Sequence, residues 1–350
     1  MSKARTTTLI TYLVKVLVLL LIMYCEEGRV SSFSPIYMSS VGPFQLPKFD
    51  VPSWFTGNNN DNSSLSNNNA NYMSSSKLKE GDKIVIFGGT GGVGQLVTKK
   101  LNSKGFTMRV AARDTQRADE TLDDASIETV PLNLVDNEGS HTSKKQQEKD
   151  LINSLDGTSA VVISLGTTAF PTLKWKDGNT PSAIDKDAVT MIANAAATVK
   201  TIQKVVLVTS VGVNRIEEMP FLFLNLFGVL DCKRDGEDAV ISASRKEVVG
   251  GEQKGFDYVI IRPGRLVGGP YTNLDVAKLL QIEGGAENGV SVAPGDDLLG
   301  DCKRDALAEA IVQCLLNDEC SDIDFSIISN EETALSTEQW TDTFIKLKNN

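Results

Sequence analysis

The sequence predicts an α/β protein whose central feature is a doubly wound parallel sheet. Short runs of β-branched and apolar residues alternate with segments of helical spacing from residue 83 onward. These strand segments are apolar at nearly every position, which is typical of strands that helices cover on both faces. The first strand segment ends in a cluster of glycines, where the backbone can turn sharply into a helix.

The elements follow one another in the order strand, helix, strand. The run Lys83–Phe87 is the first predicted strand, and Gly92–Lys104 has the apolar spacing of a helix. Further strands are predicted at Thr107–Ala112, Ile127–Leu132, Ala160–Ser164, Lys204–Thr209 and Asp257–Arg262. The alanine-rich segment Ala183–Val199 is predicted to be one helix, because its apolar residues fall on a single face.

The domain organisation follows from a change in composition near Leu78. No linker is visible after this residue, so residues 78–350 are predicted to form one domain. A small C-terminal substrate lobe is expected within about residues 262–350 of it. Residues 25–77 include a run rich in serine and asparagine that cannot bury apolar surface, so disorder is predicted there.

The first residues have the pattern of a targeting sequence. Lys3 and Arg5 precede an apolar run from Val16 to Met23, which is too short to span a bilayer comfortably. A signal peptide is predicted over residues 1–24, with a signal anchor as the alternative. Together with Phe33 and the hydroxyl-rich stretch that follows, it resembles the bipartite presequence of algae with complex plastids. The expected location is the plastid, and secretion is the alternative, which a glycosylation sequon at Asn62 favours.

Charge and histidine content exclude several classes of function. The net charge is −10 at pH 7, which argues against broad binding of nucleic acids or anionic membranes. The only histidine is His141, in a polar stretch without a nucleophile motif, so a histidine-dependent catalytic triad is not expected. One histidine cannot build a histidine-based metal site, and no metal site is predicted. The five cysteines form no CxxC pair and are expected to be reduced.

The glycine cluster after the first strand predicts a dinucleotide site of the Rossmann type. Residues 88–94 read Gly-Gly-Thr-Gly-Gly-Val-Gly, between a strand and a helix. Glycines let the backbone approach a pyrophosphate, and the start of the helix supplies free N–H groups. The spacing of the glycines differs from GxGxxG, and a closely packed glycine turn is the alternative. The predicted cofactor contacts here are Gly88, Thr90, Gly91, Gly92, Val93 and Gly94.

The end of the second strand indicates which dinucleotide is bound. An acidic residue there commonly holds the ribose 2′-OH of NAD. Here Arg113 takes that place, and a guanidinium matches the oxygens of a 2′-phosphate. The predicted cofactor is therefore NADP, as NADPH, although the next residue, Asp114, would favour NAD. Asp136, after the third strand, is expected to accept a hydrogen bond from the adenine amino group or to cap a loop.

Over its whole body the chain resembles the atypical, NmrA-like short-chain dehydrogenases/reductases, and it is close to plastid members of that group. The resemblance covers roughly Lys83 to Ile328. The matching segments are Gly88–Gly94, Arg113-Asp114, Asp136, Val205–Gly212, Phe223–Gly228, Lys233–Glu237, Tyr258–Leu266 and Arg304–Ala308. The resemblance implies a Rossmann fold and a nicotinamide cofactor. It does not imply a reaction, because these proteins range from reductases to non-catalytic redox sensors and assembly factors.

The resemblance implies a catalytic plan from which this chain departs. Active members carry Tyr-x-x-x-Lys, in which the tyrosine transfers a proton, with a serine or threonine nearby. Lys233 takes the lysine position, but Val229 stands where the tyrosine belongs. Lys233 is expected to bind the nicotinamide ribose, to act as the general acid, or to have a structural role. Ser210 is the catalytic hydroxyl candidate and Thr209 a cofactor contact, with a strand-end cap as the alternative for either.

Residues after the sixth strand complete the predicted site. Pro263 is expected to contact the cofactor, because the carboxyl ends of strands collect ligands in this fold. Arg265 is expected either to reach an anionic substrate or to pair with an acid, and Tyr271 is a candidate proton donor. The apolar run Phe221–Phe227 is a candidate surface for a plastid membrane or a protein partner, or it packs against the substrate lobe.

Two functions are compatible with these residues. The first is an NADPH-dependent reduction of a small organic substrate in the plastid. The second is a non-catalytic NADP(H)-sensing or assembly factor that keeps the nucleotide site without the acid. The retained Lys233 and glycine loop fit both, whereas Val229 favours the second. The sequence names neither the substrate nor the oligomeric state.

Overall fold

The computed structural model of the chain describes residues 78–135, 144–245, 255–269 and 288–349. The chain divides into two units, Met1–Ala70 and Asn71–Asn350, and every described residue belongs to the second. The predicted signal peptide and transit-like segment therefore lie outside the described residues, as do Asp136, His141 and Tyr271. Among the helices that are described, none has the length and apolar character needed to cross a bilayer.

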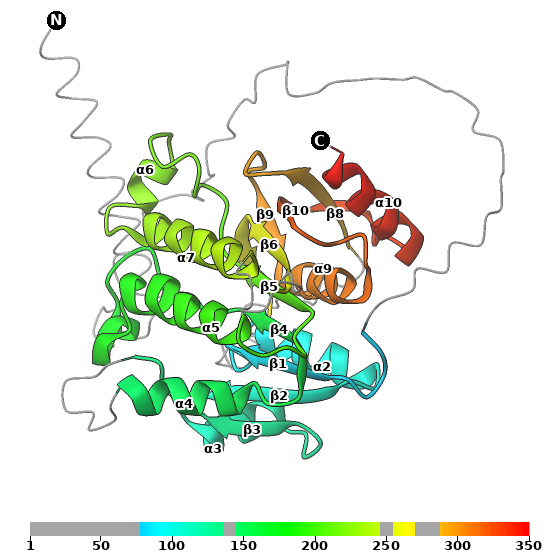
Figure 1. Cartoon of the computed structure of the whole chain (residues 1–350). Helices are drawn as coiled ribbons and strands as arrows, with labels where there is room; N and C mark the ends of the chain where they lie inside the picture. Colours follow the sequence, from blue (N-terminus) through cyan, green and yellow to red (C-terminus); the bar gives the residue numbers. More distant parts are fainter. Residues whose placement is uncertain (1–77, 136–143, 246–254, 270–287, 350) are drawn as a thin grey trace, which may run out of the picture. The chain divides into compact units, whose positions relative to one another are not determined.

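An eight-stranded sheet forms the centre of the second unit (Figure 1). Its strands lie in the order β3-β2-β1-β4-β5-β6-β10-β8. In this order they are β3 (Glu128–Pro131), β2 (Thr107–Ala112), β1 (Lys83–Phe87), β4 (Thr158–Ile163), β5 (Lys204–Val208), β6 (Asp257–Pro263), β10 (Ile323–Thr333) and β8 (Asn288–Pro294). Neighbours from β3 to β10 pair in parallel, and β8 is antiparallel to β10. The predicted doubly wound parallel sheet is confirmed.

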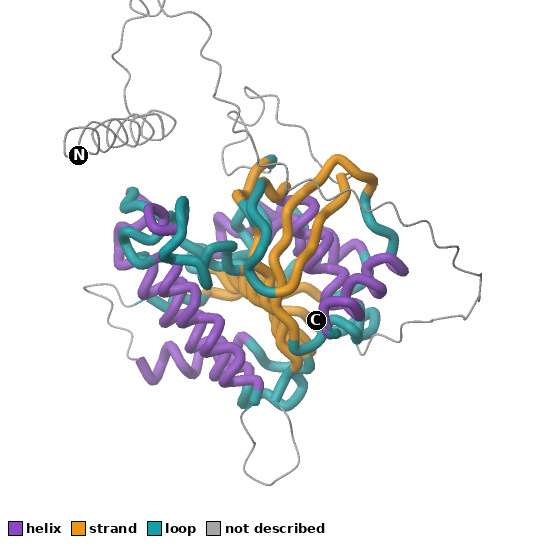
Figure 2. Tube along the Cα trace, turned by 90° about the horizontal axis from the view of Figure 1, so that it is seen from above, coloured by secondary structure: helices purple, strands orange, loops and turns teal. Residues whose placement is uncertain are grey.

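Helices cover the sheet on both sides (Figure 2). One side is packed against α2 (Gly94–Ser103), α3 (Thr115–Leu122), α9 (Arg304–Leu316) and α10 (Thr337–Lys348). The other side is packed against α4 (Lys144–Ser154), α5 (Val189–Ala196) and α7 (Val229–Ser244). The two apolar clusters between the sheet and these helices are called the first core and the second core below.

The first strand shows why the predicted strands are apolar throughout. Ile84 and Ile86 point into the first core, whereas Val85 and Phe87 point into the second, and all four are at most 2% exposed. Successive side chains of a strand point to opposite faces, so a strand covered on both faces needs an apolar residue at every position. This burial is the main stabilising contribution of β1 to the fold.

The segment Ala183–Val199 forms two elements, and the prediction of one helix is wrong in this respect. Residues Ser182–Ala188 form the π-helical segment η4, which runs directly into α5 at Val189.

Further strands, which were not predicted from the sequence, lie after β6. The chain there forms a two-stranded sheet of β7 (Arg265–Val267) and β9 (Asp301–Lys303), and β10 and β8 extend the main sheet. Two short helical segments, η3 (Leu173–Gly178) and α6 (Phe221–Leu224), lie in connections between strands and helices.

Candidate nicotinamide dinucleotide site

The strand order reverses at the centre of the main sheet. From β1 the chain continues to β2 and β3 on one side, and it returns to β4 on the other side of β1. In parallel α/β sheets, ligands bind beyond the carboxyl ends of the strands at such a point. Three segments leave the sheet at or beside it: the glycine loop after β1, Arg113 after β2 and residues 164–181 after β4. These segments define the candidate site.

The glycine loop is packed so tightly that three of its glycines leave no room for a side chain. A Cβ atom at Gly88, which has a φ of +86°, would lie 2.4 Å from the carbonyl oxygen of Ser164. A Cβ atom at Gly94 would lie 2.1 Å from the carbonyl oxygen of Gly88. At Gly89 it would lie 2.7 Å from a methyl carbon of Val110. The loop therefore reaches both β4 and β2 through approaches that only glycine permits.

The start of α2 supplies backbone N–H groups for an anion. Its N-cap residue, Val93, makes no side-chain hydrogen bond to the helix, and the Val93 side chain is buried in the first core. The first turn is thus not capped by a side chain, which suits a phosphate group at the positive end of the helix dipole. Thr90, Gly91 and Gly92 precede it and are partly exposed. This cradle fits a pyrophosphate, and Val93 would contribute only its backbone.

Arg113 and Asp114 have separate contacts at the end of β2. The Asp114 carboxylate caps α3, where its Oδ1 atom accepts a hydrogen bond from the N–H of Arg117 at 3.0 Å. Arg113 is exposed, and its Nη1 atom donates to the side-chain oxygen of Asn179, in the segment after β4. The Asp114 carboxylate therefore caps α3, whereas the Arg113 guanidinium lies at the carboxyl end of β2.

Lys233 lies in a buried ion pair at the carboxyl end of β4. Its Nζ atom is 2.5 Å from Oδ1 of Asp185, and the two side chains are 11% and 2% exposed. The other oxygen of Asp185 accepts hydrogen bonds from the hydroxyl of Thr167 at 2.5 Å and from the N–H of Thr167 at 3.2 Å. A Cβ atom at Gly166 would lie 3.3 Å from the Lys233 ammonium, so this group lies against the backbone after β4.

Asp185 was not predicted from the sequence, and the packing of two helices explains its position. Asp185 lies in η4, and Lys233 lies in α7. A Cβ atom at Gly236 of α7 would lie 2.4 Å from the carbonyl oxygen of Asp185. Glycine at this position lets the two helices approach closely enough for the carboxylate to reach the ammonium. A glycine three residues after Lys233 is the only hint of this contact in the sequence.

The position expected for a catalytic tyrosine is part of a small apolar cluster. Val229 begins α7 one turn before Lys233 and is 3% exposed. Its neighbours in the cluster are Val211, Val213, Phe221 and Leu230. No proton donor stands at this position, which agrees with the departure seen in the sequence.

The hydroxyl groups of Thr209 and Ser210 form hydrogen bonds at the end of β5, as residues that cap a strand do. The Thr209 hydroxyl donates to Oε1 of Glu237 at 2.6 Å, and the Ser210 hydroxyl donates to the carbonyl oxygen of Val211 at 3.0 Å. Glu237 is fully buried and accepts two hydrogen bonds from Arg262, at 3.0 and 2.8 Å. Burial alone would lower the pKa of Arg262, but its ion pairs with Glu237 and Asp324 raise the pKa overall. The roles predicted for Thr209 and Ser210 stay predictions.

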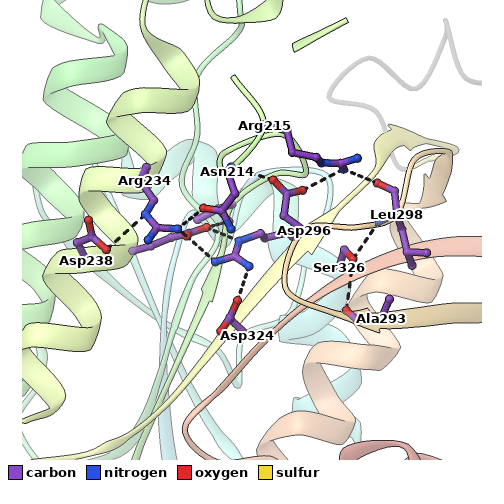
Figure 3. A network of polar contacts seen from close by, with 12 residues as sticks. Asn214, Arg215, Arg234, Asp238, Ala293, Asp296, Leu298, Asp324 and Ser326 are labelled. Carbon is purple, nitrogen blue, oxygen red and sulfur yellow. Dashed lines mark hydrogen bonds and ion pairs between the residues drawn. The ribbon is translucent and has the colours of Figure 1, made fainter. Parts of the chain in front are cut away.

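A second network fixes the loop that follows Ser210 (Figure 3). The carboxylate of Asp296, which is 2% exposed, accepts hydrogen bonds from the N–H of Gly212 at 2.7 Å and the N–H of Asn214 at 2.9 Å. Arg215 lies 3.2 Å from the same carboxylate and also donates to the carbonyl oxygen of Leu298 at 2.9 Å. The end of β5 is thereby tied to the chain after β8. No pattern in the sequence predicts this contact.

The residues predicted after β6 lie in different surroundings. Pro263 is buried as the last residue of β6, and its carbonyl oxygen accepts a hydrogen bond from the N–H of Val211 at 3.1 Å. Arg265 forms two hydrogen bonds with the Asp301 carboxylate, at 2.7 and 2.8 Å. This pairing with an acid is one of the two roles expected for Arg265, and it lowers the pKa of Asp301. Within the described parts of the chain, no three side chains gather as metal ligands would.

The chain is similar to chloroplast proteins of plants. The rice protein TIC 62, chloroplastic (Oryza sativa subsp. japonica) is 31% identical over 237 residues, which cover 59% of this chain and 44% of the relative. The chain thus spans less than half the length of that relative. An uncharacterised chloroplastic protein of Arabidopsis thaliana is 28% identical over 248 residues, which cover 68% of this chain and 74% of the relative.

A solved structure confirms the fold, and a family model identifies the cofactor class. A putative NAD-dependent epimerase/dehydratase from Bacillus halodurans is similar with a TM-score of 0.54 and 17% identity, over 76% of this chain and all of that one. The model of a family described as NAD(P)H-binding matches residues 88–318, which begin at the glycine loop and end after α9. With the reversed strand order and the glycine cradle, this match shows that the chain belongs to the family of NAD(P)H-binding proteins.

Proposed function

We propose that this protein binds NADPH in a plastid and reduces a small organic substrate with it. The observation that carries the proposal is the buried position of Lys233 beside the backbone that follows β4. This is the lysine position of the short-chain dehydrogenases/reductases that the sequence resembles. The chain keeps this group together with the glycine cradle and Arg113, although the tyrosine is replaced.

The preference for NADPH over NADH rests on the two residues after β2. Arg113 is a cation at the place where the ribose 2′-position is read in this fold. The carboxylate of Asp114, which would favour a free 2′-OH, instead accepts a hydrogen bond from the N–H of Arg117 in α3. A guanidinium binds phosphate oxygens through several parallel N–H groups, so the arrangement supports a 2′-phosphate.

Lys233 is proposed to bind the nicotinamide ribose. An ammonium has three N–H donors, and Asp185 accepts one of them at 2.5 Å, so among the described residues the other two are left for ribose hydroxyls. When bound, NADPH supplies the hydride for the reduction. The proton that the substrate needs would come from Lys233 or from water, because Val229 offers none. Pro263, Thr209, Ser210 and Asp136 remain proposed members of the same site.

The plastid location is supported by the names of the relatives and by the start of the sequence. TIC 62 and the Arabidopsis relative are both called chloroplastic. We propose that residues 1–24 act as a signal peptide, that residues 25–77 act as a transit segment, and that residues 78–350 form the mature domain. A fluorescent reporter fused after residues 1–77 should accumulate in the plastid, whereas secretion of the reporter would contradict the assignment.

A second candidate function is an NADP(H)-sensing or assembly factor without catalysis. The burial of Val229 in an apolar cluster favours it, because the usual acid is missing from the position before Lys233. In this case Lys233 and Asp185 would only hold the ribose. The exposed side chains of Leu222, Leu226 and Phe227 would offer an apolar surface to a partner.

Titration of the purified protein with NADPH and NADH, followed by a turnover assay, tests these functions. We expect NADPH to bind at least ~10-fold more tightly, as hydrogen bonds to a charged group predict. Oxidation of bound NADPH is then measured with quinones, enones and aldehydes, and Lys233→Ala should abolish any turnover. Tight binding of NADPH with no turnover on this panel would support the second function. Equal affinities for the two dinucleotides would contradict the proposed cofactor.

A further inference from the structure

We propose that Asn179 is a cofactor-specificity residue that holds the guanidinium of Arg113 ready for the 2′-phosphate of NADPH. This inference rests on the proposed preference for NADPH. It starts from residues 164–181, the segment between β4 and η4. One end of the segment contacts the Lys233–Asp185 pair through Gly166 and Thr167, and the other end contacts Arg113 through Asn179. The segment thus connects both ends of the predicted dinucleotide site.

The orientation of the Asn179 side chain is fixed by its own turn. Its Nδ2 atom donates to the carbonyl oxygen of Lys176 at 2.7 Å, and its backbone N–H donates to the same oxygen at 3.3 Å. The N–H of Thr180 closes the turn with a hydrogen bond to Gly178 at 2.7 Å. Because the side-chain nitrogen is used inside the segment, the side-chain oxygen faces Arg113. The contact is therefore built into the turn that ends η3.

The neutral amide leaves the charge of Arg113 available. Carboxylates hold other described arginines, in the pairs Arg109–Glu128, Arg262–Glu237 and Arg265–Asp301. Arg113 contacts an amide oxygen instead, which accepts one N–H and brings no negative charge. A guanidinium has five N–H donors, so the others are not engaged by the described residues and can meet phosphate oxygens. This arrangement suits a ligand that carries its own negative charge.

The amide also reduces the entropy that binding would lose. An exposed arginine samples many rotamers, and ordering it at a ligand opposes binding. Arg113 is exposed, and Asn179 orders its guanidinium before the dinucleotide arrives. The effect is confined to ligands that Arg113 contacts. Asn179 is therefore expected to change the affinity for 2′-phosphorylated ligands and to leave other ligands unaffected.

Two substitutions of Asn179 separate positioning from a general structural role. Asn179→Ala should weaken NADPH about 3- to 10-fold, the loss of about one hydrogen bond, with no change for NADH. Asn179→Asp keeps a side-chain oxygen for Arg113 but adds a negative charge beside the 2′-phosphate. It should therefore weaken NADPH more than Asn179→Ala does, again without effect on NADH. The same order of affinity losses is expected for 2′,5′-ADP, and no loss is expected for 5′-AMP. These two ligands contain only the adenosine end of NADPH and of NADH.

Isothermal titration of the full chain measures these affinities, with Asn153→Ala as the matched control. Asn153 is an exposed asparagine of α4, and its replacement should change neither affinity. Equal losses for NADPH and NADH in the Asn179 variants, or no loss for either, would overturn the inference. Arg113→Ala distinguishes a failure of the inference about Asn179 from a failure of the proposed preference for NADPH. If it weakens NADPH while the Asn179 variants do not, only the inference fails, and if it has no effect, the proposed NADPH preference fails as well.

Discussion

At the scale of single residues, Lys233 and Asp185 form an ion pair whose two charges are largely shielded from solvent. The two side chains are 11% and 2% exposed, and their charged atoms are 2.5 Å apart. Desolvation of both charges offsets much of their attraction, so such a pair adds little net stability over an apolar pair of similar volume. Loss of one partner is different, because the other charge stays buried without compensation. A gain in stability therefore does not account for the pair, which is compatible with the proposed role of Lys233 in binding the ribose.

Replacing the members of this pair singly and together should separate folding from binding. Asp185→Leu alone should lower the free energy of unfolding by about 3–5 kcal/mol, because it leaves the Lys233 ammonium buried and unpaired. Adding Lys233→Met should recover most of this stability, while NADPH affinity stays low because the ribose contact is lost. Urea unfolding and NADPH titration of the two variants measure both effects.

The exposed pair of Lys186 and Asp235 provides the control for this experiment. Its atoms are 2.7 Å apart, but the side chains are 46% and 48% exposed. Lys186→Met should therefore leave the free energy of unfolding nearly unchanged. A double variant at Asp185 and Lys233 that binds NADPH as tightly as the original protein would contradict the ribose-binding role of Lys233.

At the scale of elements, Asp114 is the N-cap of α3, and this accounts for the orientation of its carboxylate. The carboxylate of Asp114 accepts the N–H of Arg117 at the first turn of this helix. Asp114→Ala should lower the free energy of unfolding by about 1 kcal/mol, as the loss of an N-cap usually does, and Asp114→Ser should restore it. Neither should weaken NADH binding in a dinucleotide titration. A selective loss of NADH affinity in Asp114→Ala would instead show that the carboxylate holds a ribose 2′-OH.

The parallel strands and the glycine loop are the elements that the sequence predicted well. The strand ends of β1 and β2 agree with the prediction, because runs such as Ile84–Phe87 are apolar on both faces. The strand β10 was missed, because its second half reads Ser-Asn-Glu-Glu-Thr and is partly exposed. A strand that leaves the core partway along its length has neither a continuous apolar run nor a regular alternation.

Parts of the candidate site were predicted from residues that are close in sequence, and Lys233 was predicted from the family resemblance. The glycines of residues 88–94 and the pair Arg113-Asp114 each lie within one turn, so local chemistry reveals them. Asp185 and Asn179 lie 48 and 66 residues from their partners, and only the packing of η4 on α7 and of the 164–181 segment on β2 brings them together. The π-helical form of η4 is also not visible in a segment whose composition favours a regular helix.

At the scale of the whole molecule, buried thiols make the fold sensitive to alkaline pH. Cys302 is fully buried in the first core, and burial raises its pKa from 9.0 to about 12. Its thiol binds a proton in the folded state over a range where the unfolded chain has lost it. The stability that it contributes is complete below pH 9.0 and is lost as the pH rises to about 12. Burial raises the pKa of Cys314 as well, with the same sign of effect.

Thermal unfolding at rising pH checks this expectation. The midpoint of unfolding should fall steadily between pH about 9 and about 12, and the fall should be shallower in Cys302→Ala. The variant has a lower midpoint at neutral pH, because a buried sulfur is removed, so the comparison concerns the slope and not the absolute value. Identical slopes in the two proteins would show that Cys302 does not contribute.

The place of β10 in the sheet has a consequence for how the protein folds. This strand is formed by Ile323–Thr333, and it pairs with β6 on one side and with β8 on the other. As long as β10 is not in place, β6 has an unpaired edge, and such an edge can pair with strands of other chains. Docking of β10 between β6 and β8 is therefore the step that protects the partly folded protein from aggregation.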